Sequence, residues 1–396
     1  MNGFLPYGRQ TIEEDDIAAV TAALTSDMLT TGPRVAAFEA AFMAATGADQ
    51  AVVCSSGTAA LHLAMLALGL GPSDTAVVPS VTFVATANAA RYVGAQVIFA
   101  DVDPDTGLMG PDHLEAALAR AGDAQPRAAL PVHLNGQPCD MAAIAAVAAR
   151  HGLALVEDAC HALGGRVANH PVGDVHFSAL TMFSLHPVKA IAMGEGGVLT
   201  TNDRALAATL RRQRNHGLER SPEGFVNVEM AFDADGRANP WYYELPAPGF
   251  NYRASDVLCA LGQSQLGKLD RFLSRRRAIA ALYDVLLAPL APVLRPVPRV
   301  AWGESGWHLY PVLINFAAAG TTRGALMRAL AAKKVGTQVH YIPVHRQPYY
   351  RAMAPDLELP GAEAYYARCL SLPFYPTMTD DDVRRVVAAL ARHLLS

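Results

Sequence analysis

Cysteine and charged residues are both scarce in this 396-residue chain, and each shortage excludes a class of protein. The five cysteines are scattered and lack Cys-x-x-Cys spacing, which argues against a disulfide frame or a zinc site and indicates reduced thiols in the cytoplasm. Charged residues make up 17% of the chain, and the net charge is −4 with a pI near 6.3. We therefore expect no binding to nucleic acid or to an anionic membrane.

Motifs of several other protein classes are also missing. No Gly-x-Gly-x-x-Gly follows a strand and no Walker motif is present, so a dinucleotide site or a P-loop is not supported. The N-terminal region lacks a basic start followed by an apolar run, and so shows no signal peptide. The most apolar helical stretch, residues 278–294, is interrupted by Asp284, Pro289 and Pro292. We expect it to be a core helix and not a membrane span.

What the sequence does contain is a long alternation of short apolar strands with helices. This pattern predicts an α/β fold with βαβ units and a mostly parallel sheet, covered by helices on both faces. Ligands of such sheets bind at the carboxyl ends of the strands. The predicted strands are 51–54, 76–79, 96–100, 128–132, 153–156, 179–185 and 198–201. The predicted helices are 13–24, 35–46, 58–68, 84–92, 111–119 and 141–150.

The chain is large enough for two domains, and its second half contains fewer parallel units. We predict a large domain over residues 1–253 and a smaller α/β domain over 254–396. In the smaller domain the expected helices and strands are 256–266, 270–287, 307–314 (strand), 322–333, 335–340 (strand) and 380–394, with Thr379 as an N-cap. Residues 218–250 are rich in proline, glycine and aromatics, and indicate a long ordered loop.

Lys189 follows the exit of an apolar strand, a position at which a solvated surface charge would be badly placed. The apolar strand 179–185 leads into Lys189, and a glycine cluster at 194–197 precedes the next strand. Burial lowers the pKa of an amine and makes it a nucleophile that can form a Schiff base. When the stretch is taken alone, a surface turn with an unimportant lysine is the better explanation.

Three upstream motifs change that balance. Ser56, Gly57 and Thr58 follow a strand and open a helix, which suits a phosphate, although a plain N-cap explains them too. Phe83 follows the next strand and could stack on a cofactor ring, or could simply belong to the core.

Asp158 comes directly after a buried strand, with His161 three residues later. Asp158 suits a protonated pyridine nitrogen, while metal ligation or a helix cap are alternatives. Metal is weakened because no third ligand has matching spacing.

The order of these motifs resembles the fold-type I pyridoxal phosphate (PLP) enzymes. Nearly the whole chain is similar to the DegT/StrS-type nucleotide-sugar aminotransferases. The stretches that carry this resemblance are 56–64, 157–165, 183–197, 214–217, 251–253 and 338–343. Within that family, three stretches resemble the members of the pseudaminic acid pathway: 29–33, 186–189 and 239–244.

The resemblance implies a role for each matching residue. Lys189 would hold the PLP cofactor covalently, and Asp158 would pair with its pyridine nitrogen. Phe83 would stack on the ring and His161 would lie near the ring hydroxyl. The phosphate would be held by Ser56, Gly57, Thr58, Ser184 and, from the partner subunit of a homodimer, Asn251. The substrate cleft would be lined by Tyr7, Thr30, His186, His340, Tyr341, Ile342 and Pro343.

The activity implied by the resemblance is a ping-pong transfer of an amino group. L-Glutamate would be the donor, and carbon four of a UDP-linked 4-keto-6-deoxy-N-acetylhexosamine the acceptor. Lys189 favours transamination over the dehydratase branch of the family, which has histidine there. A dTDP- or GDP-linked sugar, reaction at carbon three, and a PLP-binding regulator without turnover remain alternatives. Arg253 and Arg346 are the candidates for binding the glutamate carboxylate.

Overall fold

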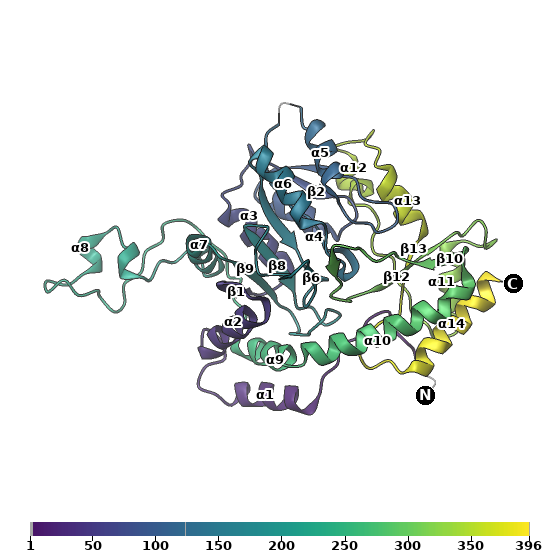
Figure 1. Ribbon diagram of the computed structural model, residues 1–396. Helices are drawn as coiled ribbons and strands as arrows, with labels where there is room; N and C mark the ends of the chain where they lie inside the picture. The colour runs from purple at the N-terminus through teal and green to yellow at the C-terminus, as the bar shows by residue number, and fades with distance from the viewer. Residues whose placement is uncertain (1–2, 123, 396) are drawn as a thin grey trace.

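A seven-stranded sheet forms the centre of the molecule (Figure 1). The computed structural model describes residues 3–122 and 124–395. The strand order is β1-β9-β8-β5-β4-β2-β3, and β9 is the strand that runs antiparallel to both of its neighbours. The strands are β1 (Gln50–Cys54), β2 (Thr75–Pro79), β3 (Gln96–Ala100), β4 (Pro126–Ala129), β5 (Ala154–Asp158), β8 (Leu180–Ser184) and β9 (Gly197–Thr201). The mostly parallel sheet predicted from the sequence is confirmed.

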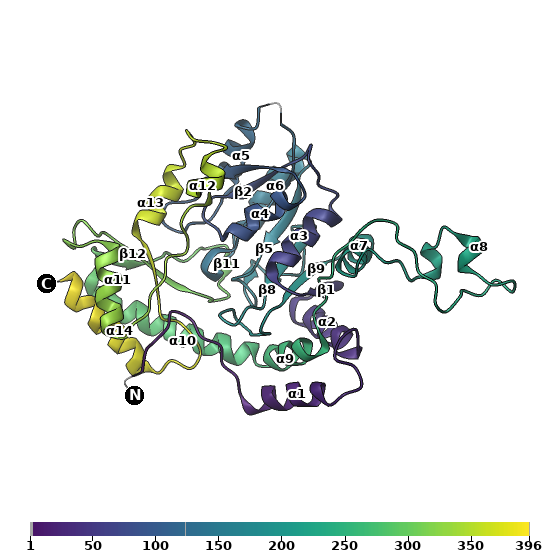
Figure 2. The ribbon, with the colours of Figure 1, turned by 180° about the vertical axis from the view of Figure 1, so that it is seen from behind.

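Helices pack on the sheet because their alanine-rich and leucine-rich faces are buried against its valines and leucines. The helices before and around the sheet are α1 (Glu14–Leu24), α2 (Pro33–Thr46), α3 (Gly57–Ala67), α4 (Val84–Tyr92), α5 (Pro111–Ala119), α6 (Met141–His151) and α7 (Arg204–Arg214). Figure 2 shows the same helices from behind, with α3 and α4 on one face of the sheet. The expected bounds of 84–92 and 111–119 are confirmed, whereas α7 was not predicted.

The C-terminal part forms a second core around a three-stranded sheet, β10-β12-β13. A long helical run crosses from the first core to the second. The elements of this part are α9 (Asp256–Leu266), α10 (Leu269–Leu287), β10 (Leu294–Pro296), β12 (Tyr310–Ile314), α11 (Arg323–Ala332), α12 (Pro348–Arg351), α13 (Pro360–Arg368), β13 (Cys369–Leu372) and α14 (Asp380–Leu394). A third small sheet consists of β6 (Arg166–Val167), β7 (His170–Pro171) and β11 (Gly303–Glu304).

One predicted strand, 335–340, is wrong. Val335 pairs with Leu5, and Gln338 pairs with Ser371, each as an isolated bridge. A strand needs a neighbour over consecutive residues, and this segment instead contacts two different partners. Thr379, in contrast, caps α14 as predicted: its hydroxyl accepts from the Asp382 N–H at 3.1 Å. No helix in the described ranges is long and apolar enough to cross a bilayer.

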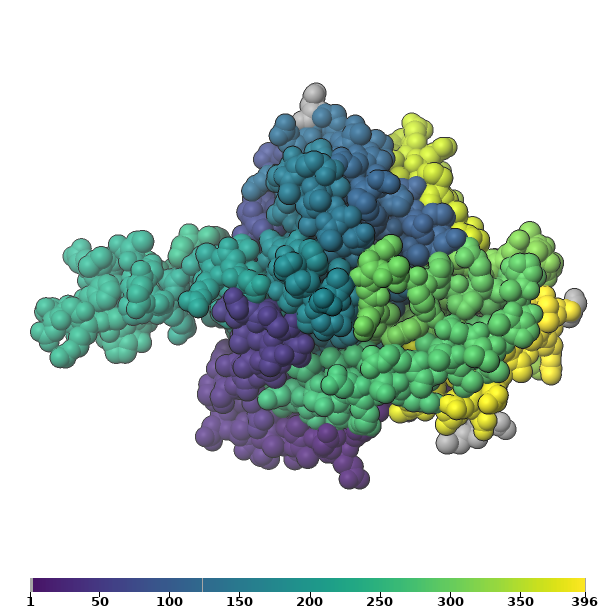
Figure 3. All heavy atoms as spheres, viewed as in Figure 1, coloured from purple at the N-terminus to yellow at the C-terminus, as the bar shows by residue number. Residues whose placement is uncertain are grey.

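Residues 218–249, which we call the projecting segment, leave the body after α7. The segment contains a 3₁₀ turn (Pro222–Gly224) and the short helix α8 (Val228–Ala231). It returns to the body at Phe250, whose carbonyl accepts from the His216 N–H at 2.8 Å. Figure 3 shows this segment as a lobe that stands out from the rest of the molecule. It corresponds to the long loop predicted over 218–250.

Candidate active site

The carboxyl ends of four strands meet at one edge of the large sheet. β1 and β8 both run antiparallel to β9, and therefore β1, β2, β5 and β8 share one direction. A cleft of about 590 Å³ opens at this edge, which is the size of a small-molecule site. The N-terminal segment contributes Tyr7 to it, and residues 338–342 line it beside Tyr7, whose ring lies 5.3 Å from that of His340.

The turn after β8 brings Lys189 into this cleft. The Lys189 N–H donates to the His186 carbonyl (2.8 Å), and the Met193 N–H donates to the Leu185 carbonyl (2.9 Å), which closes the turn. Burial lowers the pKa of the Lys189 amine from its usual value, although nearby Cys160 and Asp158 oppose that shift. At a given pH, more of the amine is therefore neutral and able to act as a nucleophile or a base.

Asp158 is the last residue of β5 and is buried beside the lysine. One carboxylate oxygen accepts from the Thr86 hydroxyl (2.7 Å) and the other accepts from the Cys160 N–H (3.2 Å). The Thr86 hydroxyl also lies 2.8 Å from that of Thr82, which must donate because the Thr86 proton faces Asp158. An ionised carboxylate has about four acceptor positions, so Asp158 can still accept from a protonated ring nitrogen.

The start of α3 forms a cradle of backbone N–H groups and hydroxyls. The Ser56 hydroxyl accepts from the Ala59 N–H at 3.1 Å and caps the helix, which begins at Gly57. A Cβ at Gly57 would lie 2.8 Å from the Cβ of Ser184, so only glycine lets the helix approach the end of β8 this closely. The unpaired N–H groups of this first turn, with the Thr58 and Ser184 side chains in the cleft, suit an anion such as a phosphate.

Two aromatic residues stand on the wall of the cleft beside Asp158. Phe83 precedes α4, is 56% exposed, and lies with its ring 6.0 Å from that of Tyr341. An exposed ring at this position is free to cover one face of a planar group. The sequence prediction had left open a core role for Phe83, and its exposure excludes that role.

Neutral histidines line the deep end. His161 accepts from the Asn135 N–H at Nδ1 (3.2 Å), so its proton is on Nε2, which lies 3.1 Å from the Tyr341 hydroxyl. Burial, with Lys189 and His340 nearby, holds the pKa of His161 well below its usual value. Burial and Lys189 together lower the pKa of His340 to about 3. Both rings are therefore uncharged near pH 7 and act as hydrogen-bonding groups.

Most of the predicted site residues come together in this cleft, but three do not. The lining residues include Tyr7, Ser56, Gly57, Thr58, Phe83, Asp158, His161, Ser184, His186, Lys189, His340, Tyr341 and Ile342. Thr30 instead pairs with Ser255, Asn251 pairs with Asn215 at the base of the projecting segment, and Pro343 is buried outside the lining. The binding roles assigned to these residues stay predictions.

The two arginines considered for the glutamate carboxylate are engaged elsewhere. Arg253 donates to Asn215 (2.6 Å) and Arg346 pairs with Glu363 (3.1 Å); neither lines the cleft. Thr86 was missed by sequence reasoning, because its partner Asp158 lies 72 positions away in the chain and no local pattern links the two. Within the described residues, the Lys, Arg, Asp and Glu side chains that line the cleft are Lys189, Asp158 and Glu195.

This set of groups fits PLP. A phosphate matches the cradle at Gly57, a planar ring matches the exposed Phe83, and a pyridine nitrogen matches Asp158, with a buried amine at Lys189. The fold and the site together define a fold-type I PLP-dependent aminotransferase. A model of the DegT/DnrJ/EryC1/StrS aminotransferase family matches residues 10–391, and the chain belongs to this family of PLP-dependent sugar aminotransferases.

Individual relatives resemble the chain along nearly its whole length. The spore coat polysaccharide biosynthesis protein SpsC of Bacillus subtilis (strain 168) is 39% identical over 392 residues, 98% of this chain and 97% of that protein. The structure of Helicobacter pylori PseC, an aminotransferase involved in pseudaminic acid biosynthesis, matches with a TM-score of 0.88 at 26% identity, covering 99% of each chain. DesI, solved in the presence of its TDP-sugar product, matches with a TM-score of 0.85 at 32% identity, covering 98% of this chain and 92% of that one.

Proposed function

We propose that the protein transfers the amino group of L-glutamate to carbon four of a UDP-linked 4-keto-6-deoxy-N-acetylhexosamine, in a pathway of the pseudaminic acid type. The observation that carries the proposal is the buried pair of Lys189 and Asp158 facing one cleft with an anion cradle. The five free thiols fit a reducing compartment, and we place the reaction in the cytoplasm.

The chain's own residues supply binding and proton transfer. PLP, when bound, supplies a ring that takes up the electron pair of the broken C–H bond. Asp158 keeps a proton on the pyridine nitrogen and so makes the ring a better acceptor. The Lys189 amine, whose pKa burial lowers, would accept the proton from the donor carbon and return it to the adjacent position. The donor, now 2-oxoglutarate, would leave, the keto-sugar would enter the same cleft, and the steps would run in reverse, which gives ping-pong kinetics.

Similarity favours the pseudaminic-type substrate, but one alternative has its own support. The TM-score is higher for PseC (0.88 against 0.85), whereas the sequence identity is higher for DesI, which was solved with its TDP-sugar product (32% against 26%). A dTDP-linked keto-sugar is therefore the second candidate. The name of SpsC specifies no nucleotide.

A panel of UDP-, dTDP- and GDP-linked 4-keto sugars tests the proposal directly. The purified protein would first be loaded with PLP and mixed with L-glutamate alone, which should change the visible spectrum of the cofactor. No change with any amino donor would favour a regulator without turnover. The loaded protein would then be given each sugar, and NMR would locate the new amine. Amination of a dTDP-sugar alone, or at carbon three, contradicts the proposed substrate.

We also propose a homodimer with shared active sites. The cofactor phosphate, the sugar diphosphate and the glutamate carboxylates are all anionic, yet the Lys and Arg side chains of the described cleft lining consist of Lys189 alone. Further polar groups are needed, and a second copy of the chain can supply them. The projecting segment supports this, because Val226 and Trp241 are 85% and 73% exposed there. Asn251, at its base, would reach the phosphate in the partner.

A further inference from the structure

One buried glutamine connects the lysine turn to the N-terminal segment. Gln265, near the end of α9, is 1% exposed. Its side-chain oxygen accepts from the Ala192 N–H (3.2 Å), and its amide nitrogen donates to the Thr11 carbonyl (2.8 Å) and to the Asp16 carboxylate (2.7 Å). A flipped amide would place the nitrogen against an N–H group and the oxygen against a carboxylate, so the orientation is unique.

The side-chain oxygen of Gln265 accepts a hydrogen bond from the turn that carries Lys189. Ala192 lies three residues after Lys189, inside the turn that the Met193 N–H closes onto the Leu185 carbonyl at 2.9 Å. This turn is neither helix nor strand, so a small number of hydrogen bonds determine its shape. The bond from Gln265 fixes its second half against α9.

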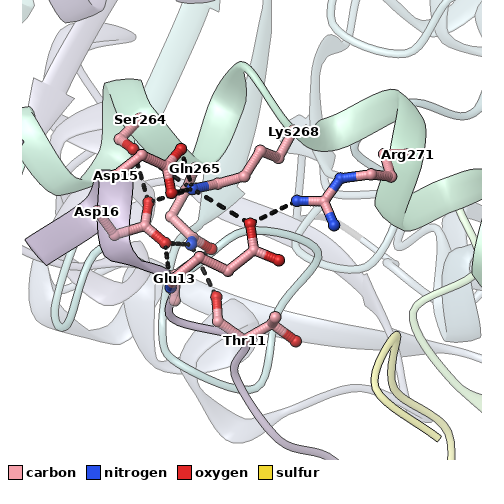
Figure 4. Close-up of polar contacts among 9 residues, drawn as sticks. Thr11, Glu13, Asp15, Asp16, Ser264, Gln265, Lys268 and Arg271 are labelled. Carbon is pink, nitrogen blue, oxygen red and sulfur yellow. Dashed lines mark hydrogen bonds and ion pairs between the residues drawn. The ribbon is translucent and has the colours of Figure 1, made fainter.

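The amide nitrogen of Gln265 donates into a dense polar cluster (Figure 4). Asp16, fully buried at the start of α1, also accepts from Lys268 Nζ (2.6 Å) and from the Ser264 hydroxyl (2.7 Å). Burial alone would lower the pKa of Lys268, but its hydrogen bonds to Asp15 and Asp16 raise it overall. Lys268 is therefore charged near pH 7, and Asp16 is a fixed acceptor for the glutamine.

The N-terminal segment held by Gln265 carries a residue of the cleft. Tyr7 lines the cleft, and its carbonyl accepts from the Phe374 N–H at 3.0 Å. Further toward the N-terminus, Leu5 pairs with the chain at Lys334 and Gly336 through backbone bonds of 2.9 and 2.7 Å. The bond from Gln265 to Thr11 fixes the segment on the other side of Tyr7.

We propose that Gln265 is a positioning residue for catalysis, which holds the turn of Lys189 and the segment of Tyr7 in one fixed relation. The inference rests on Lys189 acting as described under the proposed function. Gln265 itself touches neither the cleft nor the reacting atoms. It acts through the placement of the amine, and a displacement of about 1 Å can cost about 10²-fold in rate.

The test compares Gln265→Met with Lys268→Met in the full-length protein loaded with PLP. Gln265→Met keeps length and apolar bulk but loses all three hydrogen bonds. Lys268→Met removes the cation from buried Asp16 and leaves the bond to Ala192 intact, so it should lower the melting temperature at least as much. The readout is the pH midpoint of the visible absorbance of the bound cofactor, measured without substrate.

We expect Gln265→Met to shift this midpoint by about one pH unit and to lower kcat by roughly 10- to 100-fold, with KM changed less. Lys268→Met should leave the midpoint unchanged. The titratable groups that interact with Lys189, namely Asp158, Cys160, His161, His308 and His340, are the same in both variants, so a shift reports the position of the amine. Equal midpoints in the two variants would overturn the proposal.

A second variant covers the case in which Gln265→Met does not fold. Gln265→Glu keeps an oxygen facing the Ala192 N–H and, when protonated, an O–H facing Asp16. Burial beside the Asp16 carboxylate keeps the new carboxyl protonated, so the midpoint of this variant should match that of Lys268→Met, and a midpoint far from it would count against the inference. Failure of this inference is distinguishable from failure of the proposed site. If reduction by borohydride attaches the cofactor to a lysine other than Lys189, the site itself is wrong.

Discussion

At the scale of single residues, the lack of a bonded carboxylate separates Lys189 from Lys268, the other enclosed lysine of the described chain. The remaining lysines are Lys268, Lys333 and Lys334. Lys268 is ion-paired with Asp16 and its pKa is raised, whereas burial lowers the pKa of Lys189. Two buried amines in one fold therefore have opposite properties because one has bonded carboxylate partners and the other does not.

We predict that Lys189→Ala binds PLP without a covalent link and loses turnover. Borohydride reduction of the wild-type protein, followed by peptide mapping, should place the cofactor on Lys189. Because the other lysines fall in separate stretches of the sequence, the peptides are easy to tell apart. Recovery of the label at Lys268 would show that the assignment is wrong.

Asp158→Asn should keep the fold and the covalent link but lose about 10²-fold or more in rate, which is ~3 kcal/mol of transition-state stabilisation. The reason is that an amide cannot keep a proton on the pyridine nitrogen. Thr86→Val is the matched control, since it removes the 2.7 Å bond to Asp158 and leaves the carboxylate in place. Single-turnover rates should rank wild type above Thr86→Val and Thr86→Val above Asp158→Asn; equal rates for wild type and Asp158→Asn would exclude this role for Asp158.

The sequence located Lys189 and Asp158 because each follows a strand in an order that only a site would require. It could not locate Thr86 or Gln265 as their supports. The partners of these residues, Asp158 and Ala192, lie more than 70 positions away in the chain, and no spacing rule covers such a distance. Residues of this kind become visible only when the sheet brings separate turns together.

At the scale of helices and strands, the elements with the clearest local sequence patterns were the ones predicted correctly. A clear N-cap residue, Thr379, marked the start of α14 in the sequence. Apolar runs predicted the strands of the large sheet. The segment 335–340 has the composition of a strand, but its two bridges go to different partners, Leu5 and Ser371. Whether a run of β-forming residues becomes a strand depends on the neighbour, which the sequence does not specify.

The helix α1 provides a test of pH dependence at this scale. Burial raises the pKa of Asp16, but bonds from Lys268 and Ser264 outweigh it and the pKa is lowered overall. Its contribution to stability is thus present above the unfolded value of about 3.9 and is lost as the pH falls through the lower folded value. Lys268 has a raised pKa, so its contribution is lost only in strong alkali.

We therefore predict that α1 detaches in acid before the sheet unfolds. Hydrogen exchange of α1 amides, corrected for the intrinsic effect of pH, should accelerate below about pH 4 while α3 stays protected. Lys268→Met should show this acceleration at a higher pH than the wild type does, because the buried Asp16 carboxylate then lacks its cation. Simultaneous loss of protection in α1 and α3 would indicate global acid unfolding and no separate role for the cluster.

At the scale of the whole molecule, the projecting segment is the feature that a single chain does not explain. Its acidic residues are Glu219, Glu223, Glu229, Asp233, Asp235 and Glu244, and its arginines are Arg220 and Arg237. It thus carries an excess of negative charge together with exposed apolar side chains such as Trp241. We expect a lobe of this composition, which leaves the body (Figure 3), to gain stability by packing on a second copy.

Mixing two inactive variants tests whether the sites are shared. Lys189→Ala lacks the amine, and Asn251→Asp would place a negative charge beside the cofactor phosphate of the partner. In a mixed dimer with two-fold symmetry, one site would carry both changes and the other neither. With equal amounts and complete exchange, about half of the dimers are mixed, so activity should recover to about a quarter of the wild-type value. Mass spectrometry would confirm that mixed dimers form. If they form and activity stays absent, Asn251 acts within its own chain, because each mixed dimer would then hold two damaged sites.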